Sequence, residues 1–237
     1  MADDRFYFRQ LLSGRDFATD DALAHQMVNF VYAIGDRAHG ECVLIAPAYA
    51  VGEQLDIVEA DGMKVTGVLA THFHADHIGG NMMGLAVEGV ATLLERCSCP
   101  VHVQRDEVPW VMRSSGLGLD DLTAHDGGDV VEVGDVRITL VHTPGHTPGS
   151  QCFHVDGRLV SGDTLFLEGC GRTDFPGSDP EAMYDSLQTL GAMPEGTVVY
   201  PGHRYSAPSS ATIDAIRESN YVYKPRSKEQ WLTMFGH

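Results

Sequence analysis

Short runs of apolar residues, separated by polar and glycine-rich stretches, recur through the first half of the chain. These runs are rich in Val, Ile, Leu, Phe and Tyr, a composition that is typical of β-strands. Longer segments between them combine apolar and charged residues in the manner of amphipathic helices. We expect strands at residues 29–34, 41–46, 65–70 and 100–104 and helices at residues 51–62 and 84–97.

The second half of the chain alternates apolar and polar residues on either side of turn residues. Gly134 and Gly157 stand in the middle of two such alternating segments, which predicts two β-hairpins. Asp179 followed by Pro180 is a typical helix start, and Ser227 begins a capping box. We expect hairpins at residues 130–142 and 151–163, helices at residues 179–190 and 227–235, and a strand at residues 196–200.

This order of elements predicts an α/β fold in which helices lie outside and sheets lie inside. The chain has no linker rich in Pro, Gly or Ser and no internal repeat of 20 to 50 residues. We therefore expect a single domain over residues 1–237, with a short helical tail at about residues 206–237.

Composition and charge narrow the class of protein. The chain has 237 residues, of which 43% are hydrophobic and 21% charged, and its formal net charge is -17. That charge argues against a nucleic acid or an anionic membrane as partner. We also expect no membrane-spanning segment, no export signal and five reduced cysteines, and therefore a cytoplasmic location.

The stretch THFHADHIGG places three histidines and an aspartate within six positions, directly after a predicted strand. If extended geometry continues past the strand, His72, His74 and Asp76 project to one side, and His77 faces elsewhere. Imidazoles with a carboxylate suit zinc or another borderline divalent cation. One loop could therefore supply ligands to two neighbouring ions.

Three further candidates lie far away in the sequence but share one context. His146, Asp163 and His203 each follow a predicted strand, in a turn marked by Gly or Pro. Loops at strand ends are where a rigid scaffold presents functional groups. These three residues are therefore candidates to complete the site that the histidine cluster begins.

The motifs THFHADH, TPGHTPGS, SGDTLF and PGH, in this order, resemble the metallo-β-lactamase superfamily. The resemblance implies a four-layered αββα sandwich with metals at one edge of the two sheets. It implies a first ion held by His72, His74 and His146. It implies a second ion held by Asp76, His77 and His203, with Asp163 bridging both.

A carboxylate shared by two ions leaves room for a bridging hydroxide, which is the nucleophile of a metallohydrolase. Asp76 and Asp163 would orient that hydroxide and are the candidate catalytic residues. The segment 162–187 resembles the glyoxalase II-like branch, whose members hydrolyse thioesters of glutathione. We therefore expect a hydrolase of a small thiol-derived thioester with two divalent ions, zinc first and iron or manganese as alternatives.

Two other activities stay open at this point. Persulfide dioxygenases of the same branch keep a single Fe²⁺ on residues matching His72, His146 and Asp163, and GCGRTDF is a close match to them. They more often carry alanine at the position of Gly202, which favours the hydrolase here. A lactonase would use the same bridging hydroxide.

Substrate contacts and assembly are less constrained by the sequence. The longer C-terminal helical domain that carries the glutathione contacts of glyoxalase II looks truncated in this chain. Candidates to bind a carboxylate-bearing thiol instead are Arg172, Tyr205, Lys224 and Arg226. A homo-oligomer is compatible with the sequence.

Overall fold

Two six-stranded sheets form the centre of the molecule in the computed structural model, which describes residues 5–236. The first sheet has the strand order β1 (Phe6–Leu12), β2 (Phe30–Asp36), β3 (Glu41–Ile45), β4 (Lys64–Leu69), β7 (Val101–Gln104), β8 (Leu122–His125). The second has the order β14 (Ala211–Thr212), β13 (Val198–Pro201), β12 (Arg158–Gly162), β11 (Gln151–Val155), β10 (Val136–His142), β9 (Val130–Val133). Strands β3, β4, β7 and β8 are parallel, as are β12 and β13.

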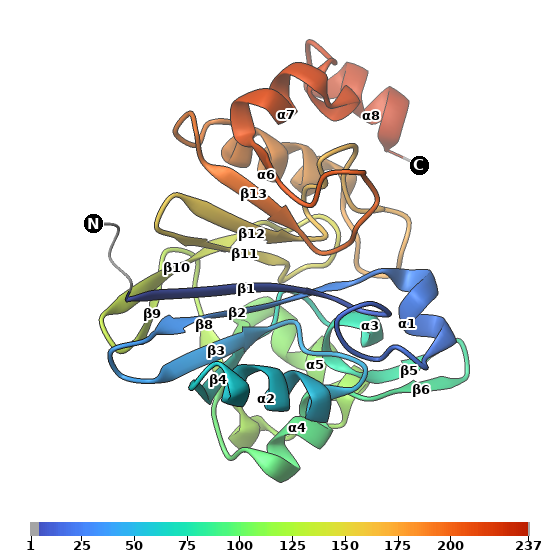
Figure 1. Cartoon of the computed structure of the whole chain (residues 1–237). Coiled ribbons are helices and arrows are strands. Elements are labelled where there is room, and N and C mark those ends of the chain that lie inside the picture. The colour runs from blue at the N-terminus through green and yellow to red at the C-terminus, as the bar shows by residue number, and fades with distance from the viewer. Residues whose placement is uncertain (1–4, 237) are drawn as a thin grey trace.

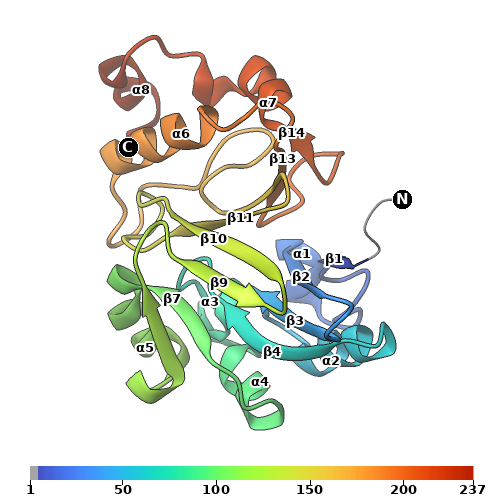
Figure 2. The same cartoon turned by 90° about the vertical axis from the view of Figure 1, so that its left-hand side faces the viewer.

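Helices cover the two outer faces of this pair of sheets. They are α1 (Ala22–Met27), α2 (Val51–Ala60), α3 (Ala75–Ile78), α4 (Val90–Arg96), α5 (Val108–Ser115), α6 (Pro180–Gly191), α7 (Ile213–Ser219) and α8 (Lys228–Phe235). Figure 1 shows α2 and α4 below the first sheet and α6, α7 and α8 above the second. The view turned by 90° shows the same layers, with α5 beside α4 (Figure 2). The expected αββα sandwich is confirmed.

The strands are buried on both faces because each sheet lies between a helical layer and the other sheet. Along β2, Tyr32 and Ile34 belong to the core between the sheets, while Ala33 belongs to the core under α2 and α4. In the second sheet Phe153 faces the first sheet, and Cys152 packs with α6 and α8. This explains why the strands read as nearly continuous apolar runs.

The two predicted hairpins are present as β9–β10 and β11–β12, with positive φ at Gly134 and at Gly157. The predicted helix starts are also confirmed. The Asp179 side chain accepts hydrogen bonds from the first turn of α6, and the Ser227 hydroxyl accepts one from the Gln230 amide at the start of α8. The turn and cap residues therefore predicted these hairpins and helix starts correctly.

The helix expected over residues 84–97 is wrong in its first half. A small hairpin of β5 (Gly80–Met82) and β6 (Leu85–Val87) occupies that region, and α4 begins only at Val90. Met83 and Gly84 both have left-handed backbone conformations, with φ of 52° and 88°, which make the tight turn of this hairpin. Strands β1, β8 and β14 and helices α1, α3 and α5 were also not predicted from the sequence. Among residues 5–236, no helix has the length and apolar character that crossing a bilayer requires.

Candidate metal centre

The histidine-rich loop leaves the first sheet at the end of β4 and passes directly into α3. His74 is extended, with φ -63° and ψ 143°, and it is the N-cap of α3, which carries Asp76 and His77. The expectation of extended geometry through Asp76 is therefore wrong beyond His74. The helical turn ends at Gly79, whose φ of 83° favours glycine.

The three distant candidates arrive from the second sheet. His146 follows β10, Asp163 directly follows β12, and His203 follows β13. Backbone hydrogen bonds join the two sheets at this edge: the Gln151 amide donates to the Thr71 carbonyl at 2.9 Å. The structure thus brings all seven predicted ligands to one edge of the sandwich, in three overlapping groups of potential metal donors.

One group consists of His72, His74 and His146. The Nδ1 atom of His74 lies 3.1 Å from Nε2 of His72 and 3.0 Å from Nε2 of His146. Nitrogen ligands about 2.05 Å from a tetrahedral zinc ion lie about 3.3 Å from one another. One proton on His74 cannot serve both neighbouring lone pairs, whereas a cation among the three rings satisfies all of them.

A second group consists of Asp76, His77 and His203. The Nε2 atoms of His77 and His203 are 3.1 Å apart, and they lie 3.5 and 3.4 Å from Oδ2 of Asp76. Asp163 lies between the two groups: its carboxylate oxygens are 3.3 Å from His77, 3.2 Å from His203 and 3.8 Å from His146. Asp163 is therefore placed to share its carboxylate between two ions.

Hydrogen bonds fix the tautomers of two imidazoles. The Nδ1–H of His146 donates to the Arg172 carbonyl at 2.8 Å, and the Nδ1–H of His203 donates to the Met27 carbonyl at 2.7 Å. Each ring therefore directs its Nε2 at the cluster. Such bonds from the outer ring nitrogen are usual for metal-binding histidines.

The electrostatics of the cluster also fit a divalent cation. Burial holds the pKa of His72 well below its usual value, so this imidazole is neutral and able to ligate. Although burial opposes ionisation, the rings of His203 and His77 hold the pKa of Asp163 well below its usual range. Oδ1 of Asp163 is nevertheless buried and makes no hydrogen bond within residues 5–236, although Nε2 of His77 lies 3.3 Å away. A buried carboxylate in that condition is stabilised by a bound cation.

Two residues that support the cluster were not predicted from the sequence. Asn29 donates from Nδ2 to Oδ2 of Asp76 at 3.1 Å. Glu107, which is buried, accepts hydrogen bonds from the Phe73 amide at 2.7 Å, the Gly149 amide at 2.7 Å and the Thr147 hydroxyl at 2.8 Å. It therefore connects the loop of His72 and His74 to the loop of His146. The sequence offered one indication of Asn29, which is a polar residue directly before an apolar strand. It offered no indication of the role of Glu107.

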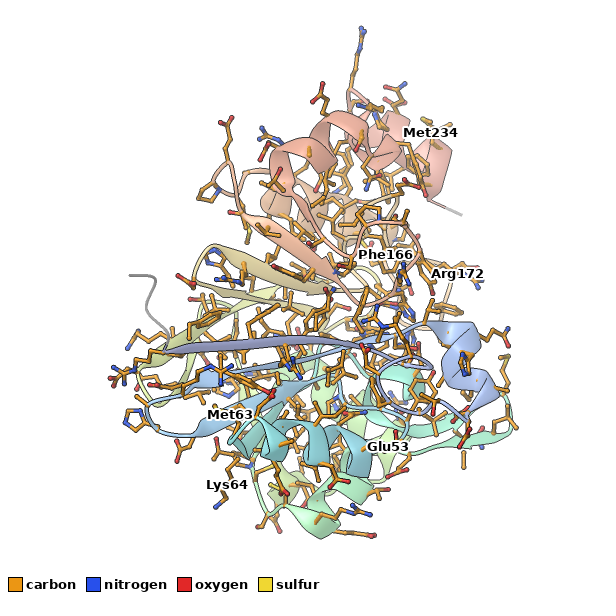
Figure 3. The ribbon with its side chains drawn as sticks, in the orientation of Figure 1. Glu53, Met63, Lys64, Phe166, Arg172 and Met234 are labelled. Carbon is orange, nitrogen blue, oxygen red and sulfur yellow. The ribbon has the colours of Figure 1, made fainter. Side chains whose placement is uncertain are left out.

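A cavity of about 710 Å³ opens over the cluster. Arg172 and Tyr205, both expected to contact substrate, line it. Lys224 and Arg226 do not line it, and the Lys224 ammonium donates to the Glu218 carbonyl. Phe166 and Arg172 lie on the same side of the molecule, away from Met63 and Lys64 at the start of β4 (Figure 3).

A His- and Asp-rich metal-binding cluster at one edge of an αββα sandwich defines the class: a metalloprotein with the metallo-β-lactamase architecture. The model of the metallo-beta-lactamase superfamily matches residues 27–203, so the chain belongs to this superfamily.

Several known proteins resemble this chain in sequence or in structure. The chain is 34% identical over 204 residues to a hydroxyacylglutathione hydrolase of Rhodopseudomonas palustris, covering 85% of this chain and 72% of that protein. It is 26% identical to a probable polyketide biosynthesis zinc-dependent hydrolase, BaeB, of Bacillus velezensis, over 88% of each chain. Among solved structures, ETHE1 from Myxococcus xanthus superposes with a TM-score of 0.78 at 29% identity, over 98% of this chain and 90% of that one.

Proposed function

We propose that this protein is a metal-dependent hydrolase that cleaves a small thiol-derived thioester, acting as a single domain. The carrying observation is the double donor set, in which Asp163 lies between two groups of ligands. The identity with hydroxyacylglutathione hydrolases supports the choice of a thioester. The reaction consumes water and releases a carboxylic acid and a thiol.

The metal proposal is two divalent ions. His72, His74 and His146 would hold one, Asp76, His77 and His203 would hold the other, and Asp163 would contact both. Seven donors exceed the four ligands that a structural zinc site uses, which supports two ions. Zinc is the first expectation because five imidazoles suit a borderline cation, and iron and manganese accept the same donors.

Bound ions of this kind supply a water of lowered pKa and polarise the carbonyl to be attacked. The residues of the chain do the rest. Asp76 and Asp163 would accept hydrogen bonds from the attacking water and aim it at the thioester carbon. Asn29 holds the carboxylate of Asp76 in place, and the Met27 and Arg172 carbonyls keep His203 and His146 in the required tautomers.

The second candidate is a mononuclear Fe²⁺ persulfide dioxygenase that uses His72, His146 and Asp163. The 3.8 Å separation between His146 and Asp163 is compatible with two ligands of one ion. The backbone favours the hydrolase, because a Cβ at Gly202 would lie 2.2 Å from Oδ1 of Asp163. The alanine more usual in the dioxygenases would not fit beside Asp163 in this position.

One set of measurements on the purified chain tests the proposal. Metal content per chain is determined together with cleavage of S-lactoylglutathione and other thioesters, opening of a lactone, and oxygen uptake with glutathione persulfide. We expect two ions per chain and thioester cleavage. A single iron with oxygen uptake and no thioesterase activity would overturn the proposal in favour of the dioxygenase, and lactone opening alone would favour a lactonase.

A further inference from the structure

The side chains that form the walls of the cavity indicate the chemistry of the substrate, which the metal ligands at its base do not. Most of the side chains that line it, other than the ligands, are apolar or aromatic, among them Met27, Phe73, Met82, Met83, Phe166 and Phe175. These residues come from different parts of the chain: the end of α1, the histidine loop, the β5–β6 hairpin and the loops after β12.

Aromatic rings flank the metal cluster from two directions. The Phe175 ring lies with its centroid 5.4 Å from that of His74 and 6.1 Å from that of His146. Phe166 lies 6.1 Å from His203 on the other side. A carbonyl group placed at the cluster would therefore direct its substituents along aromatic walls.

The cavity has few charged side chains besides the metal ligands, and the guanidinium of Arg172 is already paired. Apart from the ligands, Glu168 and Arg172 are the charged side chains that line it within residues 5–236. Arg172 makes a bidentate ion pair with Asp174, at 2.8 and 2.6 Å, and its guanidinium lies 4.3 Å from the Phe175 ring centroid. The Asn81 side-chain oxygen also has a partner, the Gly84 amide at 2.9 Å. The remaining polar side chains of the lining, Asn81, Ser114, Glu168, Tyr205 and Tyr221, are fewer than the apolar and aromatic ones that have no polar group.

The β5–β6 hairpin exposes apolar surface directly at the cavity. Met83 lines the cavity and is 90% exposed, and Leu85 in the same hairpin is 55% exposed. The exposed Met83 side chain is therefore available to contact an apolar group that enters the cavity. Methionine adapts its shape to such a group because its unbranched side chain is flexible.

We propose that this site selects thioesters with a bulky apolar acyl group over hydroxyacyl thioesters. The proposal rests on the thioester hydrolase function. Because each buried methylene contributes roughly a fourfold gain in binding, kcat/KM should rise about fourfold per added methylene while the acyl chain lies along the apolar wall.

The test uses the metal-loaded protein and one carrier throughout, glutathione. Cleavage is compared for the S-acetyl, S-butanoyl, S-hexanoyl and S-lactoyl esters. Met83→Asn removes the exposed apolar side chain but tolerates the left-handed backbone at this position. Leu119→Asn is the matched control, since Leu119 is 65% exposed and does not line the cavity.

We expect kcat/KM to rise from acetyl to hexanoyl, the hexanoyl ester to exceed the lactoyl ester, and the rise to flatten in Met83→Asn but not in Leu119→Asn. A flat series with the lactoyl ester best overturns the inference and leaves the hydrolase function intact.

If no thioester is cleaved, the hydrolase function itself fails. Calorimetry with S-methyl-, S-butyl- and S-hexylglutathione then decides the apolar selection separately. Affinity that rises along that series and depends on Met83 supports selection by the cavity, and constant affinity overturns it.

Discussion

Glu107 connects the two loops that carry the first group of ligands, and replacing it tests how the site is held together. The Glu107 carboxylate accepts hydrogen bonds from the Phe73 and Gly149 amides and from the Thr147 hydroxyl. Glu107→Ala leaves both amides buried without an acceptor. Each such loss costs about 1–3 kcal/mol, so the free energy of unfolding should fall by about 2–6 kcal/mol.

Glu107→Gln separates shape from charge. The amide oxygen of glutamine can keep the bonds to Phe73 and Thr147, but its NH₂ group then faces the Gly149 N–H, so two donors oppose each other. We expect a loss of about 1–3 kcal/mol, between wild type and alanine. Urea unfolding of the metal-free chain measures the stability, and titration with zinc measures the affinity, which should fall in the same order.

Glu53 provides the control, because its carboxylate also accepts a backbone hydrogen bond, from Ala18 at 2.8 Å, and it lies on α2 well away from Phe166 and Arg172 (Figure 3). Glu53→Gln should leave zinc affinity unchanged. If Glu107→Ala matches wild type in both stability and zinc affinity, Glu107 does not hold the two loops.

The pH dependence of the same variant gives a second readout. Burial raises the pKa of Glu107 to about 7. Between about pH 4.5 and pH 7 the folded chain therefore binds a proton that the unfolded chain has released, so stability falls as the pH rises. The expected loss is roughly 3 kcal/mol across this window. Glu107→Gln lacks this contribution, and the stability gap between wild type and variant should narrow from pH 5 to pH 8 in urea unfolding.

Three further predictions address other parts of the molecule. Asp76→Ala or His203→Ala should reduce the bound metal from two ions to one per chain and lower thioester cleavage by more than about 100-fold; full metal content and activity in both would contradict the ligand assignment. Gly202→Ala forces a Cβ to within 2.2 Å of Oδ1 of Asp163, so stability should fall by about 1–3 kcal/mol and zinc should raise the melting temperature less than in wild type; an unchanged thermal shift would refute this. The Arg5 guanidinium holds the pKa of Asp36 well below its usual range, so the stability from this pair is present above about pH 4 and is lost as the pH falls; the urea midpoints of Asp36→Asn and wild type should converge in acid, and a constant gap would contradict the reasoning.

The sequence was most informative where chemistry is local. The loop from His72 to His77 concentrates its donors within six positions, and the Asp179 and Ser227 caps act on the helices that directly follow them. Strand ends marked by Gly or Pro pointed to the distant candidates, and their ordered motifs placed them in one site. The structure brings these residues together as expected, and their assignment to two ions stays a proposal.

The sequence was least informative where tertiary contacts decide. Glu107 reads as one more surface carboxylate, because its partners are loop amides that only the fold brings to it. Helical spacing over residues 84–97 concealed a hairpin, since the left-handed turn at Met83 and Gly84 overrides helix propensity. The cavity walls come from segments that lie far apart in the sequence, so the apolar character of the cavity could not be predicted along the chain.

The split of the donor set between the two sheets has a consequence for how the protein matures. Four donors are translated with the first sheet, and the last, His203, follows β13 near the end of the second. A nascent chain on the ribosome therefore holds half a site until the second sheet has formed and docked. An ion that needs both halves binds only the assembled sandwich, and its stabilisation grows with the logarithm of the free metal concentration. Metal supply would thus act late in maturation, because it stabilises only those chains in which the two sheets have docked.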